Sequence, residues 1–157
     1  VPYEAFGMLK IPEVLKKTSS FLLKTPLPRQ NPIKIDEIRP TYIYNLYNLD
    51  PNWDKDILAN RILLLEPSHF SQYPVSQKTI DFITEFSKEN IVQIQIYVGE
   101  FEELVSNYNL KKVHYKEHPL NAHYKGIEVA RDWMFDVQGY YPSFFSFWKK
   151  CKKQLNY

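Results

Sequence analysis

The chain has 157 residues, of which 44% are hydrophobic and 16% aromatic, and its formal net charge at pH 7 is +2. This composition excludes a disordered chain, predicts a packed globule of one domain, and gives no strong electrostatic signal for nucleic-acid binding. A single cysteine, Cys151, excludes a framework of internal disulfides and indicates a reducing, cytoplasmic setting. No apolar run approaches the roughly 18 residues that span a bilayer, and no signal peptide is visible.

The first forty residues predict an extended arm that leads into the folded domain. A short helix is expected at Pro12–Leu15, because proline suits the first position of a helix. Prolines then crowd the stretch up to position 40, where each removes a backbone donor and disfavours helix in the residue before it: Pro26, Pro28, Pro32 and Pro40. We therefore take residues 1–40 as an arm or linker and residues 41–157 as an α/β domain. Because the chain begins with valine, we expect it to be a piece of a longer protein.

The stretch 61–65, RILLL, is the strongest secondary-structure signal in the chain. A short unbroken apolar run is typical of a strand buried on both faces, and such strands belong to parallel sheets covered by helices. The preceding stretch 41–48, TYIYNLYN, is rich in β-branched and aromatic residues and predicts another strand. A turn at 49–52 joins the two.

Helices and strands alternate after this buried strand. We expect a helix over 74–89, with Phe82 on its inward face, and a helix over 100–108. Strands are expected at 91–98, where alternating glutamines indicate a position near an edge, and at 112–116. This order is a βαβ series. It predicts a three-layer α/β domain, Rossmann-like or flavodoxin-like, with a mainly parallel sheet.

The C-terminal part begins with a polar loop at 120–130. The segment 131–137 is apolar enough to be buried, and a final helix is expected over 142–155. Four apolar positions recur at helical spacing in that helix and are expected to lie on the core: Phe144, Phe147 or Trp148, Cys151 and Leu155.

Polar side chains follow three of the predicted strands, with Glu100 after the middle one, and form a candidate ligand site. Because parallel strands end at one edge of a sheet, these groups are expected to converge there. The candidate residues are Glu66, Ser68, His69, Glu117, His118 and Arg131. A pocket of acids and imidazoles would prefer a neutral or cationic aromatic ligand over a polyphosphate, unless Arg131 or another cation intervened. The alternative is ordinary turn and cap chemistry, in which Glu66 or Ser68 binds loop amides.

Other kinds of site have little support in the sequence. The four histidines, His69, His114, His118 and His123, do not have a metal-binding spacing, so we expect no metal. No nucleophile elbow and no glycine-rich phosphate loop is present. The lysines and aromatic residues of the last helix could form a nucleic-acid patch, but aromatic residues at helical spacing usually belong to a core.

Five stretches resemble the C-terminal region of deoxyribodipyrimidine photolyase-related proteins. They are NRILLLEPSHFSQYPVSQKTIDF, IYVGEFEEL, YKEHPLNAHYKGIE, RDWMF and GYYPSFFSFWKK. The resemblance covers residues 1–157 and is strongest over 60–76 and 115–150. In that family a photolyase-type helical domain that binds FAD precedes a region like this one.

The resemblance implies a parent flavoprotein, a carbon–carbon lyase that splits cyclobutane pyrimidine dimers in DNA with light, or a cryptochrome-like relative. FAD is implied for the upstream domain, with no cofactor in this chain itself. Residues 94–118 also resemble the photolyase antenna domain, which implies a domain able to hold an antenna chromophore. The expected partners are the FAD domain of the same chain and, through the parent, DNA. The alternatives are a stand-alone α/β domain that binds a small molecule or nucleotide, or hydrolyses one, and a DNA-contacting module.

Overall fold

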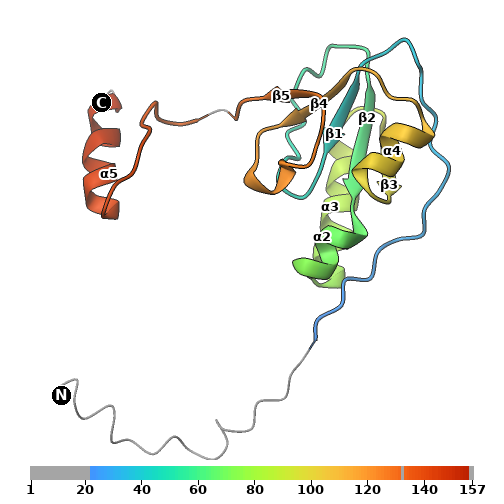
Figure 1. Ribbon diagram of the computed structural model, residues 1–157, viewed down its shortest axis with the longest axis horizontal. Helices are drawn as coiled ribbons and strands as arrows, with labels where there is room; N and C mark the ends of the chain where they lie inside the picture. Colours follow the sequence, from blue (N-terminus) through green and yellow to red (C-terminus); the bar gives the residue numbers. More distant parts are fainter. Residues whose placement is uncertain (1–21, 132, 156–157) are drawn as a thin grey trace, which may run out of the picture.

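The computed structural model describes residues 22–131 and 133–155. Five parallel strands form one sheet in the order β3-β2-β1-β4-β5 (Figure 1). The elements are β1 (Thr41–Tyr44), β2 (Asn60–Leu65), α2 (Pro67–Gln72), α3 (Gln77–Asn90), β3 (Ile94–Val98), α4 (Phe101–Asn107), β4 (Val113–Lys116), η2 (Pro119–Asn121), β5 (Ile127–Val129), α5 (Phe144–Cys151) and η3 (Lys152–Gln154). The predicted α/β fold with a parallel sheet is confirmed. Over the described ranges, no helix is long and apolar enough to cross a membrane.

Strand β2 lies inside the sheet, and all six of its residues are buried. Its side chains alternate between two apolar clusters. Ile62 and Leu64 pack in the cluster that contains the buried residues of α4, whereas Leu63 and Leu65 pack with the buried residues of α3. Because successive strand residues point to opposite faces, α4 covers one face of the sheet and α3 the other. The molecule is therefore a three-layer sandwich around β2 (Figure 1).

A buried cation joins the β1–β2 loop to the sheet. The Arg61 side chain is 2% exposed and donates to the carbonyl oxygens of Trp53, Asp54 and Ile57. It also donates to the Tyr44 hydroxyl at 3.2 Å. These acceptors offset the desolvation of the guanidinium. The loop thus covers the sheet face that also carries α3.

Residues 22–40 contain no helix or strand and run along the outer edge of β3. Gln95 exchanges two hydrogen bonds of 2.7 Å with the backbone of Lys34. Ile33 is buried in the same cluster as Ile62. This arm therefore covers the free edge of β3, which is an edge strand as predicted. The short helix expected at 12–15 lies outside the described residues.

Several boundaries differ from the predictions. Strand β1 ends at Tyr44, because Asn45 and Asn48 close a tight loop through an isolated bridge. The sequence after β2 was predicted to be a polar cluster, but Pro67 begins the short helix α2, and α3 starts at Gln77. Strand β5 was predicted to be a loop. It is only three residues long and depends on its pairing with β4, which the local sequence does not reveal.

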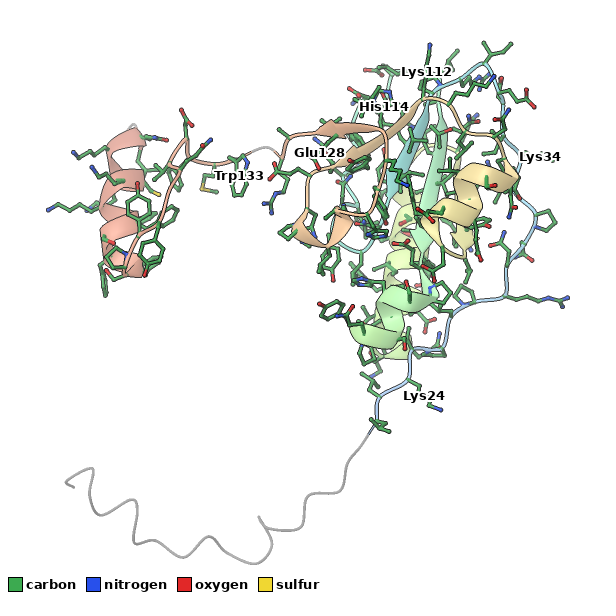
Figure 2. The ribbon with its side chains drawn as sticks, viewed as in Figure 1. Lys24, Lys34, Lys112, His114, Glu128 and Trp133 are labelled. Atoms are coloured by element: carbon green, nitrogen blue, oxygen red, sulfur yellow. The ribbon has the colours of Figure 1, made fainter. Side chains whose placement is uncertain are left out.

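The prediction that the last helix packs on the core is wrong for Phe144, although Cys151 of the same predicted face is fully buried. Four large apolar side chains of the C-terminal segment are more than 60% exposed: Trp133, Met134, Phe144 and Phe145. Helix α5 lies away from the sheet (Figure 1), and Figure 2 shows Trp133 on the segment that leads to it. The helix packs on its own preceding segment through the Phe135–Trp148 ring pair. Helical spacing shows which side chains share a face, but not what covers that face. For the same reason Phe82, predicted to point inward, is 61% exposed.

Candidate ligand site at the carboxyl edge of the sheet

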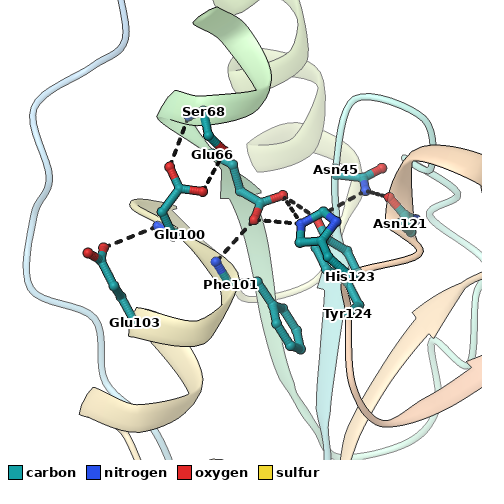
Figure 3. Close-up of polar contacts among 9 residues, drawn as sticks. All are labelled: Asn45, Glu66, Ser68, Glu100, Phe101, Glu103, Asn121, His123 and Tyr124. Carbon is teal, nitrogen blue, oxygen red and sulfur yellow. Dashed lines mark hydrogen bonds and ion pairs between the residues drawn. The ribbon is translucent and has the colours of Figure 1, made fainter. Parts of the chain in front are cut away.

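Glu66 follows β2 directly, and its carboxylate is 5% exposed. It accepts a hydrogen bond from the backbone N–H of Phe101 at 3.0 Å and one from the Tyr124 hydroxyl at 2.9 Å. His123 Nε2 lies 2.9 Å and 3.1 Å from its two oxygens (Figure 3). Glu66 thus joins the end of β2 to the start of α4 and to the loop after β4. Its binding of the Phe101 amide is the cap chemistry that the sequence left open.

Ser68 lies toward α4 and interacts with a carboxylate. Its backbone N–H and its hydroxyl donate to the two oxygens of Glu100 at 2.9 Å and 2.6 Å (Figure 3). Glu100 is the residue before α4, and its own backbone N–H donates to Glu103 at 3.2 Å. Ser68 therefore connects the starts of α2 and α4. Both of these contacts of Ser68 belong to this helix-end arrangement.

Tyr47 links the two predicted groups of site residues. Its ring stacks on His118, with ring centroids 4.0 Å apart and an angle of 8° between the planes. Its hydroxyl lies 3.1 Å from His69 Nε2. His69 and His118, which follow different strands, therefore lie at the same end of the sheet. The residue that joins them belongs to the loop after β1.

A hollow of about 110 Å³ lies between the ends of β1 and β4. Glu117 and Arg131 border it, and their side chains approach to 3.8 Å. The lining residues are Tyr47, Asn48, Asp50, Lys116, Glu117, His118, Asn121 and Arg131. The chain runs from β1 to β2 and β3 on one side and then crosses to β4 and β5 on the other. This reversal makes the β1–β4 crevice the place where α/β sheets of this kind bind ligands.

Burial favours the neutral form of two imidazoles at this edge, those of His69 and His118. Burial lowers the pKa of His69, although the nearby Glu66 carboxylate opposes the shift. Burial also lowers the pKa of His118, and the positive charge of Arg131 adds to the effect. Burial and the Glu66 carboxylate raise the pKa of Tyr124, so its hydroxyl stays a donor. The edge is thus equipped to bind by stacking and hydrogen bonds.

The structure places all six predicted site residues at the carboxyl edge, but divides them among different contacts. Glu117, His118 and Arg131 line the hollow, His69 reaches it through Tyr47, and Glu66 and Ser68 are engaged by protein groups. Four further residues of this edge were not predicted as site residues: Asn45, Tyr47, Asn121 and Tyr124. Asn45 and Tyr47 were assigned to a strand, and recognising that β1 ends at Tyr44 would have included them.

Over residues 22–131 and 133–155, no three histidine, cysteine or acidic side chains are placed to hold a metal ion. His123 approaches one acidic residue, Glu66, while His114 stacks on Tyr42 with ring centroids 4.8 Å apart. Comparisons of the chain with protein-family models, curated proteins and solved structures find no match. The chemistry of the carboxyl edge therefore provides the argument for function.

Proposed function

We propose that this chain is a small-molecule-binding accessory domain of a cytoplasmic, deoxyribodipyrimidine photolyase-related flavoprotein. One observation supports binding above the others: the hollow at the β1–β4 crevice, where aromatic, imidazole and charged side chains meet. The neutral imidazoles and the ring of Tyr47 suit a planar chromophore, so the domain would act in an antenna-like way. Catalysis, FAD and contact with DNA would belong to the parent protein.

The exposed C-terminal aromatic residues support the accessory role. Phe144 and Phe145 are 67% and 78% exposed on α5, and Trp133 is 62% exposed before it. Apolar side chains grouped in this way mark surfaces that pack on another protein part. The FAD domain implied by the sequence resemblance is the partner we propose for this surface.

Fluorescence titration with riboflavin, and calorimetric titration with ATP, tests the binding role. We expect riboflavin to bind by placing the outer ring of its chromophore in the hollow. ATP should not bind, because a hollow of about 110 Å³ does not enclose a polyphosphate and its two carboxylates offset its two basic side chains. His69→Ala removes the group that holds the Tyr47 hydroxyl and should weaken riboflavin binding. Lys88→Ala, an exposed change in the last turn of α3, should leave it unaltered. The binding role is refuted if neither riboflavin nor ATP binds.

Expression of the complete gene tests the accessory role. The product should carry FAD, and a Phe144→Ser/Phe145→Ser double variant should be cleaved faster by a protease in the junction between the FAD domain and this one. A product without flavin would leave the second candidate, a stand-alone α/β domain that binds a small molecule or nucleotide. The hollow at the β1–β4 crevice would serve that candidate as well.

A further inference from the structure

We propose that the hollow between β1 and β4 binds a neutral ring that presents a carbonyl oxygen beside an N–H group, as in a lactam or imide. This inference rests on the proposed function, because it specifies the ligand chemistry of the same site. Three properties of the hollow carry it: donors without partners, balanced charge, and a size that matches one ring.

Two of the residues that line the hollow carry donors without a partner. Across the described ranges 22–131 and 133–155, three side-chain nitrogen or oxygen atoms are buried without a hydrogen-bond partner: Asn48 Nδ2, Trp53 Nε1 and Arg131 Nε. Asn48 and Arg131 both line the hollow. Buried donors without an acceptor are uncommon in folded proteins and destabilise them. An acceptor oxygen of a bound molecule would satisfy these two N–H groups.

The surrounding contacts explain why these donors are the ones that lack a partner. The Asn48 Oδ1 atom faces the backbone N–H of Asp50 at 3.5 Å, which leaves the NH₂ end of the amide for another acceptor. Arg131 directs Nη2 toward Glu117 at 3.8 Å, and its guanidinium carbon lies 4.2 Å from the ring centroid of Trp133. The Nε–H group of Arg131 has no such contact.

The charges around the hollow balance. Lys116 and Arg131 are cationic, whereas Asp50 and Glu117 are anionic. His118 adds no charge near neutral pH, because burial lowers its pKa. A bare anion would meet the two carboxylates, and a cation would meet the two basic side chains, so neither gains from the net field. A neutral ligand avoids both costs and can offer an N–H group to a carboxylate.

The dimensions of the hollow match a single ring. Its volume is about 110 Å³. A cavity of roughly 150 Å³ holds benzene, so this smaller hollow admits one small ring at most and does not enclose a chain of phosphates. The stacked rings of Tyr47 and His118 provide an aromatic wall. His118 Nδ1 accepts from the Leu120 N–H at 3.2 Å, so the neutral ring carries its proton on Nε2 as a further donor.

Calorimetry with three small probes tests this inference directly. Uracil is a neutral imide ring, 1,3-dimethyluracil has the same ring without N–H groups, and benzoate is an anion of similar size. We expect uracil to bind at least about tenfold more tightly than either of the other two. This ratio corresponds to a difference of about 1.4 kcal/mol in binding free energy. Equal or tighter binding of benzoate or 1,3-dimethyluracil would overturn the inference.

Substitutions test which donors act. Asn48→Asp replaces the unpartnered amide nitrogen with an oxygen, and Arg131→Lys keeps the charge but removes Nε. Each should weaken uracil binding about tenfold or more, whereas Lys88→Ala should not change it. Thermal melting checks that the variants fold, and the probe comparison stands if they do not. Undiminished binding of uracil by folded variants contradicts the inference alone. Failure of riboflavin and all three probes to bind contradicts the proposed function as well.

Discussion

Glu66→Ala should destabilise the domain strongly, because the Glu66 carboxylate is the acceptor for two buried donors. The change leaves the Phe101 N–H and the Tyr124 hydroxyl without this acceptor. Each buried donor left unsatisfied costs about 1–3 kcal/mol, which gives about 2–6 kcal/mol for the pair. His123 is 51% exposed and can bind water instead, so it adds little. A loss near 4 kcal/mol is large against the roughly 5–15 kcal/mol of a typical domain.

Urea unfolding followed by far-UV circular dichroism and tryptophan fluorescence measures this loss as a lower midpoint at unchanged slope. Glu102→Ala is the matched control, because Glu102 pairs with Lys125 at 3.2 Å while both side chains are at least 75% exposed. Such a surface pair should contribute no more than about 1 kcal/mol. If Glu66→Ala and Glu102→Ala unfold at the same urea concentration, Glu66 does not join the elements as described.

Three further changes probe the fold. Gly126→Ala should destabilise the β4–β5 pair, because the added methyl group would press on the Val113 carbonyl oxygen; unaltered thermal melting would contradict this. The free energy of unfolding should fall as the pH drops from about 6.5 through the lowered pKa of His118, because the unfolded chain binds a proton at a higher pH than the folded one. His118→Phe should make this pH dependence smaller in urea titrations. Leu64→Asp should abolish cooperative unfolding, whereas Lys152→Ala should change stability by less than about 0.5 kcal/mol.

The sheet was predictable where a strand carries its own signal. Residues 61–65 are apolar without interruption, and burial on both faces follows from that pattern alone. β5 has no such signal: Ile127 is 50% exposed, and the strand exists because it pairs with β4. The strand order itself is a long-range property, which local periodicity does not contain.

The site was predictable to the extent that parallel strands share an edge. That rule brought His69 and His118 to one end of the sheet, although it could not show that Tyr47 would connect them. Glu66 and His123 are 57 residues apart, and their contact depends on the path of the loop after β4. Helix α5 was harder to predict. The spacing of its aromatic residues is clear, but the local sequence does not show which surface covers them.

The central claim is that the carboxyl edge between β1 and β4 binds a planar small molecule. Nuclear magnetic resonance of the ¹⁵N-labelled chain during titration with riboflavin tests it most directly. The account predicts saturable shifts of the Tyr47 and His118 amides and of the Arg131 Nε–H signal, with no shift at Asn60 or Gln95 at the opposite edge. Shifts confined to Asn60 and Gln95, or no saturable shift at all, would contradict it.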